Sequence, residues 1–303
     1  MYSRYEHEGL VWIDLESPTR EEVTRIIEEF QVAPLIAEEL LFPATKPRAE
    51  FYERYAYIVL HFPALRHSHK TREQEIDFLV GQRFLITTHY DVIDPLHKFA
   101  KIFEVHSILE KDEVDDHAGF LFFYMLKKLY KAVEHEVEYV RHEMTQIEES
   151  IFSDRQVEMV AAISRSARDL LNLRQMIEPH REVLQTIEAD GPQLFGKEFS
   201  PYLRAISNEY YRVHNHVMRE MESLHELRET NNSLLTTKQN ETMKVFTVLA
   251  FVTLPLSLIA SLFNMNVIDV PLEHNPYGFW IIISGMIAIS LLMLWFFKYK
   301  KWF

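Results

Sequence analysis

A line of small and polar side chains follows one face of an uncharged stretch near the C-terminal end of the sequence. At spacings of three and four residues it comprises Asn240, Met243, Thr247, Ala250, Leu254, Ser257, Ser261 and Asn264. Six of these eight are small or polar, so the line can pack helices closely in lipid or face a water-filled path between symmetry copies. It ends in two closely spaced amides, Asn264 and Asn266, whose oxygens can accept hydrogen bonds from the waters around a cation. This ending favours the water-filled path.

Two uncharged stretches position these residues, at 245–263 and 279–297. Each holds 19 residues. As a helix, each would extend about 28 Å at about 1.5 Å per residue, enough to cross a hydrocarbon core of about 30 Å. We therefore predict a membrane protein in which a large soluble part precedes two transmembrane helices, and in which the first helix lines the path.

Lysines flank the two predicted spans at the ends away from their connecting segment: Lys238, Lys244, Lys298, Lys300 and Lys301. The connecting segment, residues 264–278, carries Asp269 and Glu273 and has no lysine or arginine. Positively charged flanks remain in the cytoplasm. The pattern therefore predicts a multi-pass protein of the cell inner (plasma) membrane with both termini cytoplasmic and the acidic segment outside. Residues 298–303 form the basic tail, and the two loop acids are expected to concentrate cations at the outer mouth.

The net charge argues against several function classes. The chain has 45 acidic and 32 basic residues, a balance of −13, which does not suit nucleic acid as a partner. It has no cysteine, which excludes disulfides, thiolate metal sites and cysteine nucleophiles. Glycine-rich phosphate loops, serine elbows and His-Glu-x-x-His zinc motifs are absent from the sequence. An enzyme is therefore not predicted.

The N-terminal part, residues 1–115, has the pattern of an α/β domain with a mixed sheet. Short runs rich in apolar, β-branched and aromatic residues predict strands at 9–15, 55–62, 75–80 and 83–89. Gly81 and Gln82 predict a tight turn between the last two strands. Thr19 and Glu22 form a capping box that begins a helix extending to about Phe30.

The pattern becomes wholly helical from residue 116. Apolar residues at spacings of three and four predict a long helix through Ile151, and Ser153 with Gln156 is predicted to cap a second one. The two helices would form a cytoplasmic helical hairpin within residues 116–196. Gly191 with Pro192, and then Gly196, are predicted to break the chain.

A very long helix is predicted to follow this break. Ser200 and Pro201 suit its first positions, and the sequence has no convincing breaker before Asn264. Roughly 60 residues of helix would extend on the order of 90 Å. Its first part, residues 197–244, forms a stalk that leads into the span at 245–263. A seam this long cannot be buried by one small domain, so the pattern predicts association between chains.

Several of these segments resemble CorA-type magnesium channels. NETMKVFT at 240–247, LPL at 254–256 and FNMN at 263–266 resemble the family's first membrane helix, and FKYKKWF at 297–303 resembles its basic C-terminus. WIDL at 12–15, SPT at 17–19, EIDF at 75–78 and LITTH at 85–89 resemble its cytoplasmic αβα domain. The resemblance covers the whole chain and is most specific in the membrane portion.

The resemblance implies a funnel-shaped homopentamer. Each chain would have an α+β cytoplasmic αβα domain, a long-helix stalk and two C-terminal transmembrane helices, and the assembly would pass hydrated Mg²⁺, with Co²⁺ and Ni²⁺ as further candidates, down the electrochemical gradient. The implied selectivity filter is Asn264, Met265 and Asn266. The implied pore lining is Asn240, Met243, Phe246, Ala250, Leu254, Ser257 and Ser261. Asn266 and Asn240 are the implied contacts to the metal ion, and Phe246 replaces Thr247 of the spacing pattern as a hydrophobic constriction.

Two departures from the family pattern are apparent. Asn264 stands where the family's Gly-Met-Asn signature has glycine, and asparagine is the residue type next most tolerant of left-handed backbone. The stalk element that reads Phe-Arg-Asp-Val-Tyr-Asp-His in relatives aligns here with residues 211–216 and lacks both acids. The resemblance still implies Mg²⁺ as the transported ion. Because both acids are missing, the intersubunit site for a regulatory Mg²⁺ would be absent or built from other residues.

Two alternative functions stay open at this point. Fifteen histidines and the altered filter are compatible with a relative specialised for Zn²⁺ or another transition metal. Loss of the filter glycine is compatible with a non-conducting, membrane-anchored sensor or scaffold. Two histidine pairs are weak metal candidates. A spacing of two on a helix does not place the rings of His214 and His216 on one face, and His67 and His69 are expected in a hairpin loop as solvated side chains.

Overall fold

The computed structural model describes residues 1–7, 9–63, 73–91, 93, 95–97, 99, 117–264 and 276–300. The chain divides into two compact units, Met1–Arg228 and Glu229–Phe303. The first unit contains a sheet with helices on both faces, and the second contains the apolar helices.

A six-stranded mixed sheet is the centre of the first unit. Its strands are β1 (Tyr2–His7), β2 (Leu10–Glu16), β3 (Arg48–Phe51), β4 (Tyr55–Pro63), β5 (Glu73–Gly81) and β6 (Phe84–His89), in the order β1-β2-β6-β5-β4-β3. Of these neighbours, β2 and β6 run parallel and the other pairs are antiparallel. The four predicted strands are confirmed as β2, β4, β5 and β6, while β1 and β3 were not predicted.

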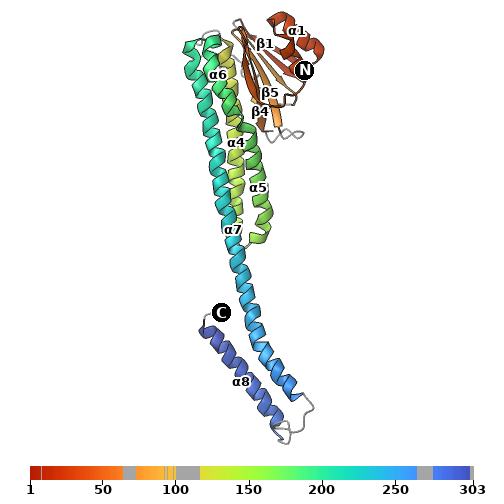
Figure 1. Ribbon diagram of the computed structural model, residues 1–303, viewed down its shortest axis with the longest axis vertical. Helices are drawn as coiled ribbons and strands as arrows, with labels where there is room; N and C mark the ends of the chain where they lie inside the picture. The colour runs from red at the N-terminus through yellow and green to blue at the C-terminus, as the bar shows by residue number, and fades with distance from the viewer. Residues whose placement is uncertain are drawn as a thin grey trace. The chain divides into compact units, whose positions relative to one another are not determined.

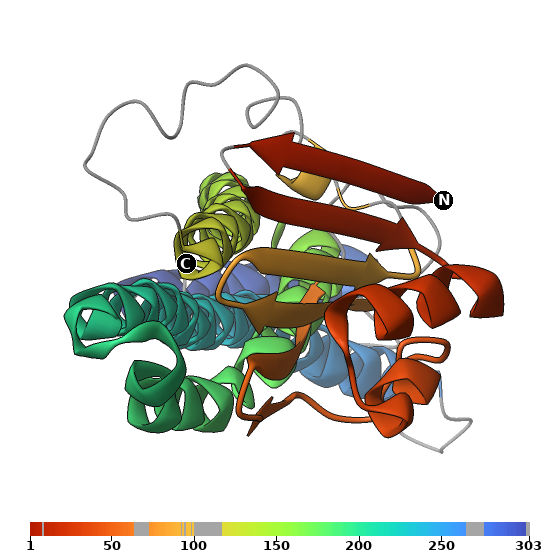
Figure 2. The same ribbon diagram turned by 90° about the horizontal axis from the view of Figure 1, so that it is seen from above.

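One face of the sheet is covered by α1 (Arg20–Phe30) and α2 (Pro34–Glu39). The predicted capping box is present, since the Thr19 side chain accepts from the Glu22 amide at 3.3 Å and the Glu22 carboxylate accepts from the Thr19 amide at 2.8 Å. Val23 and Ile36 from the helices pack with Tyr57 of the sheet in one buried cluster. Figure 2 shows the two helices lying together over the strands.

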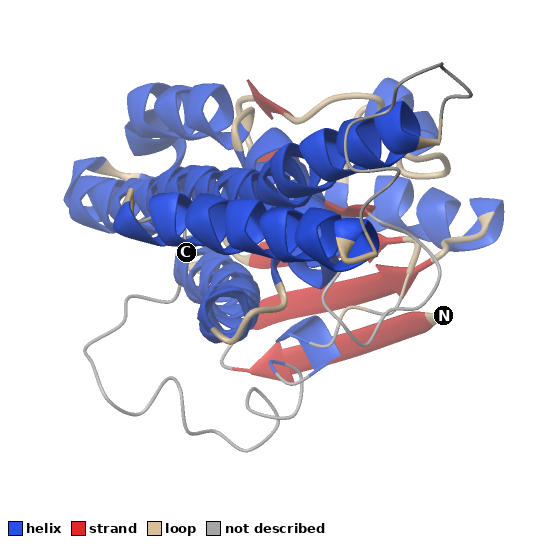
Figure 3. Ribbon diagram, turned by 90° about the horizontal axis from the view of Figure 1, so that it is seen from below, coloured by secondary structure: helices blue, strands red, loops and turns tan. Residues whose placement is uncertain are grey.

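The opposite face of the sheet packs against α4 (Ala118–Phe152). The rings of Phe78 and Phe122 lie 5.3 Å apart, and those of Phe62 and Tyr130 lie 5.7 Å apart. The sheet is therefore the middle of three layers, which Figure 3 shows with strands in red between helices in blue. β4 is buried along its whole length because both of its faces are covered, and its sequence is correspondingly almost continuously apolar.

The segment after α4 differs from the predicted two-helix hairpin. It contains α5 (Gln156–Ile177), α6 (His180–Phe195) and the short 3₁₀ helix η1 (Lys197–Phe199), so α6 was missed. The predicted cap by Ser153 is also wrong. Asp154 adopts a left-handed φ of 67° in a tight turn, and Ser153 instead ends α4 by donating to the Glu149 carbonyl at 2.8 Å. Arg155 occupies the N-cap position of α5.

The predicted break at Gly191 and Pro192 is wrong as well. Both residues lie inside α6, with Pro192 in its last turn. A Cβ atom on Gly191 would lie 2.6 Å from the Leu203 side chain, so this glycine permits close packing rather than a break. The break falls at Gly196, whose φ of 88° suits glycine.

The long helix α7 extends without interruption over Ser200–Phe263, as predicted, and α8 spans Gly278–Tyr299. In the first unit α7 runs parallel to α4 (Figure 1). Arg212 on α7 pairs with Glu134 on α4 at 3.0 Å, and His216 lies 3.7 Å from Glu138 one turn further along both helices. These contacts and the buried Leu203, Ile206 and Val213 attach the first half of α7 to the helical layer.

Candidate ion pathway

The second half of α7 exposes its small and polar line. Asn240, Met243, Phe246, Ala250, Leu254, Ser257 and Ser261 are all exposed in the single chain. On a helix of about 3.6 residues per turn these positions share one face. The side chains of its two large apolar members, Phe246 and Leu254, are 62% and 69% exposed.

The opposite face of α7 is the one that is covered. Val248 is buried, and Val252 and Ile259, which lie on the same side, are half-buried. The ring of Phe251 lies 6.2 Å from that of Phe297 on α8, and Phe297 is itself buried. Within this unit α8 therefore contacts α7 away from the small and polar line, which leaves that line free to face other chains or water.

Phe246 and Thr247, the two alternative members of the line, differ in exposure and in hydrogen bonding. The Thr247 hydroxyl donates to the Met243 carbonyl at 2.7 Å, and the side chain is half-buried. Thr253 uses its hydroxyl in the same way, on the Leu249 carbonyl at 2.7 Å. These hydroxyls are satisfied by their own helix, as a polar group in hydrocarbon requires. Phe246 carries no such bond and points away from the covered face.

Asn264 follows the last residue of α7. Its backbone amide donates to the carbonyls of Ala260 at 3.2 Å and Ser261 at 3.1 Å, and its side chain is exposed. The described non-glycine residues with positive φ are Ser17, Gln31 and Asp154. Asn264 is not among them.

Several predicted site residues lie outside the described residues. These are Met265 and Asn266 of the implied filter, the loop acids Asp269 and Glu273, and Lys301 of the basic tail. His67 and His69 also lie outside them. Lys298 and Lys300 are described, at the end of α8 and just after it.

The two stalk histidines contact different partners. The His214 ring lies 5.7 Å from Tyr210, whereas His216 contacts Glu138 and, at 3.5 Å, Glu220. Across the residues that the structure describes, no group of three or more His, Asp or Glu side chains is placed to hold a metal ion. The α4–α7 ion pairs of this region were missed by sequence reasoning, although their register follows from pairing two parallel helices.

The fold and the exposed line on an apolar helix define a membrane transport protein. Two helices, α7 and α8, contain apolar windows with a mean hydropathy of 2.3, long enough to cross a bilayer. A family model described as CorA-like Mg²⁺ transporter protein matches residues 7–300. The chain therefore belongs to this family, whose members are transporters rather than enzymes, and its two C-terminal helices span the membrane.

Comparisons with individual proteins agree along nearly the whole chain. The cobalt/magnesium transport protein CorA of Thermotoga maritima is 28% identical over 300 residues, which cover 96% of this chain and 83% of that protein. The complete structure of the CorA magnesium transporter from Methanocaldococcus jannaschii has a TM-score of 0.83 at 20% identity, covering 99% of this chain and 93% of that one. The full-length CmaX protein has a TM-score of 0.74 at 16% identity, covering 97% and 89%. The predicted fold class is confirmed in its αβ domain, stalk helix and C-terminal apolar helices.

Proposed function

We propose that this chain forms a homopentameric channel that passes hydrated Mg²⁺ across the membrane down its electrochemical gradient. The observation that carries the proposal is the arrangement of α7, in which the small and polar line is exposed opposite the face that contacts α8. Copies of α7 around an axis would turn this line inward and leave α8 toward lipid. Family membership supports the same assignment.

In this proposal the channel recognises Mg²⁺ through the water molecules that the ion retains. Mg²⁺ keeps several waters even in protein sites. A ring of amides from Asn266 offers neutral oxygens that accept from those waters but cannot compensate full dehydration. Asn264 adds a second ring at the outer mouth, and Asn240 provides an amide at the opposite end of the line. Phe246 and Leu254 then act as apolar constrictions.

The membrane potential drives the ion inward. Moving one charge through 100 mV is worth about 2.3 kcal/mol, hence about 4.6 kcal/mol for a divalent cation. The positive flanks Lys238, Lys244, Lys298 and Lys300 support a cytoplasmic location for both termini in the plasma membrane. The acidic segment would then face the side from which Mg²⁺ enters.

Ion flux into liposomes tests the proposal directly. Purified protein should admit Mg²⁺, while parallel assays with Co²⁺ and Zn²⁺ distinguish a magnesium channel from a transition-metal relative. We expect Asn266→Ala to abolish selective Mg²⁺ flux and Asn264→Gly to preserve or increase it. An inert hexaammine complex, similar in size to hydrated Mg²⁺, should block the same mouth. Normal Mg²⁺ conduction by Asn266→Ala, together with no block, would refute the filter assignment.

Native mass measurement in detergent tests the assembly separately. The proposal requires five copies, because an exposed polar line and a long stalk seam need several chains around an axis. A monomer or dimer at micromolar concentration would overturn the pore arrangement. Absence of flux for every ion from a protein that is pentameric would instead support the non-conducting scaffold.

A further inference from the structure

Two acidic side chains of β5 are buried side by side against the face of the sheet that α2 covers. Glu75 and Asp77 are two residues apart on one strand, so their side chains point to the same face. Asp77 is 1% exposed and Glu75 is 9% exposed. The two carboxyl groups are close enough to interact, and Glu75 raises the pKa of the Asp77 carboxyl. An ionised carboxylate is an acceptor only, so the two groups can hydrogen-bond to each other only when one of them carries a proton.

The pair has further partners on β4. Asp77 pairs in register with Val59, and Glu75 with His61. The Tyr57 hydroxyl donates to Asp77 Oδ2 at 3.4 Å, and His61 Nε2 lies 3.2 Å from Glu75 Oε2. Asp77 Oδ1 is buried without a hydrogen-bond partner. Burying an ionised carboxylate with one oxygen that lacks a hydrogen bond costs much more free energy than burying the neutral acid in the same place.

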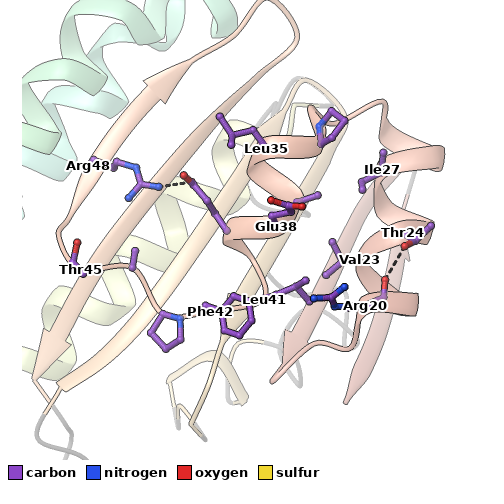
Figure 4. A pocket seen from close by; sticks show the side chains of 15 residues that line it. Arg20, Val23, Thr24, Ile27, Leu35, Glu38, Leu41, Phe42, Thr45 and Arg48 are labelled. Atoms are coloured by element: carbon purple, nitrogen blue, oxygen red, sulfur yellow. Dashed lines mark hydrogen bonds and ion pairs between the residues drawn. The ribbon is translucent and has the colours of Figure 1, made fainter.

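Glu75 also holds the connection between α2 and β3, residues 40–47. The Ala44 amide donates to Glu75 Oε1 at 2.8 Å. Residues of this connection form one wall of a surface cavity of about 690 Å³, which Figure 4 shows with Leu41, Phe42 and Thr45 along it. The connection is therefore attached to the sheet through one member of the buried carboxyl pair.

The electrostatic surroundings favour a neutral Asp77. Burial raises the pKa of the Asp77 carboxyl well above its usual range, and the neighbouring Glu75 carboxylate raises it further. The charged and titratable groups around the pair come from every adjoining element. They are Tyr57 and His61 of β4, Arg48 and Glu50 of β3, Glu39 of α2, and Tyr90 after β6. Arg48 is already shared between Glu39 and Glu50 and lies over the Tyr57 ring at 5.4 Å.

We propose that the Glu75–Asp77 pair is a proton-binding site that holds the connection at residues 40–47 against the sheet and releases it when the shared proton leaves for solvent. With the proton present, Asp77 donates to Glu75, and Glu75 accepts from Ala44. Without it, two carboxylates repel each other in a site of low dielectric. Opening of the connection admits water to both and relieves this repulsion.

Hydrogen exchange of the full-length protein in detergent tests the site. The probe is the peptide covering residues 40–47, with rates corrected for the intrinsic pH dependence of exchange. Opening should increase by about tenfold per pH unit while the pH lies between the ordinary carboxyl pKa and the raised pKa of Asp77, because opening releases one proton. Asp77→Asn should remove this dependence, since its amide is neutral at every pH and can still donate to Glu75.

Two further measurements keep the test decisive. Infrared absorption of a protonated carboxyl should be present in the wild-type protein at neutral pH and absent from Asp77→Asn. Glu75→Gln should retain it, because Asp77 stays buried and burial by itself disfavours its ionised form. Glu53→Gln, at an exposed acid between β3 and β4, is the matched control and should behave as wild type in both assays. Identical pH dependence in wild type and Asp77→Asn, or no protonated carboxyl at neutral pH, would overturn the proposal.

Discussion

In the unit Met1–Arg228 the large apolar side chains lie inside, with Trp12, Tyr57 and Phe78 fully buried, whereas in Glu229–Phe303 side chains of the same kinds face outward. Trp280 is 65% exposed, although it has the same residue type as Trp12. The first unit buries its large apolar side chains within its own fold. The second leaves most of them exposed in the single chain, where lipid and other copies of the chain would cover them.

The strongest way to test this difference is to add bulk to the exposed line of α7. Ala250→Trp would fill the proposed axis with five indole rings, and we expect Mg²⁺ flux into liposomes to fall to background. The variant should still assemble, because Ala250 lies away from the face that contacts α8. Leu292→Trp adds a ring at an exposed position of α8 and should conduct normally. Full conduction by Ala250→Trp would place the pathway elsewhere.

Removal of a buried ring should have its effect on the first unit alone. Trp12 is 0% exposed and donates from its indole nitrogen to the Thr87 hydroxyl at 3.0 Å. Trp12→Ala should lower the free energy of unfolding of this unit by about 3–5 kcal/mol, the usual cost of an aromatic deletion in a core. Hydrogen exchange of β4 amides measures this change. Trp280→Ala, the matched exposed change, should leave those amides unaffected, and an equal loss would contradict the separation of the two units.

Acid should weaken the first unit through His180. This residue is fully buried between the His61 carbonyl, which Nε2 contacts at 2.8 Å, and the Tyr130 hydroxyl, which Nδ1 contacts at 3.0 Å. Burial lowers the pKa of His180 to about 4. The unfolded state, with a histidine pKa of about 6.5, binds the proton first. The stabilisation is therefore complete above pH of about 6.5 and is lost as the pH falls toward 4, a difference of about 3 kcal/mol.

The measurement compares wild type with His180→Gln, whose side-chain amide can still donate to the His61 carbonyl. The difference between the two in unfolding free energy, taken from β4 amide exchange between pH 7 and pH 4, should shrink as the pH falls. Flux measured at neutral pH should be unaffected. A difference that stays constant over this range would show that His180 does not titrate between the folded and unfolded states.

The smallest expected effect concerns the loop acids of the second unit. Neutralising both, as Asp269→Asn with Glu273→Gln, should reduce Mg²⁺ flux by about twofold to fivefold at low ionic strength, because exposed charges attract cations over a Debye length of about 8 Å at physiological salt. The loss should disappear at high salt. An equal loss at both ionic strengths would indicate direct coordination of the ion instead.

Local signals were sufficient for much of the fold. The capping box at Thr19, the strand β6 with its β-branched run and the continuous helix to Phe263 were all predicted, because each depends on residues within a few positions of one another. Ser153 and Gly191 were misinterpreted for the complementary reason. Asp154, in a left-handed conformation, separates Ser153 from α5, so Ser153 ends α4 and does not cap the next helix. Leu203, which is distant in sequence, occupies the space beside Gly191.

The sequence by itself determined the two membrane spans, the positive flanks and the line of small and polar residues, since periodicity and charge are properties of the chain. Only the tertiary structure decided that α8 contacts the side of α7 where Val248 is buried. It also placed Glu75 and Asp77 against the connection that contains Ala44. Such choices depend on which surfaces meet in space, and packing between distant segments leaves no periodic trace in the residues themselves.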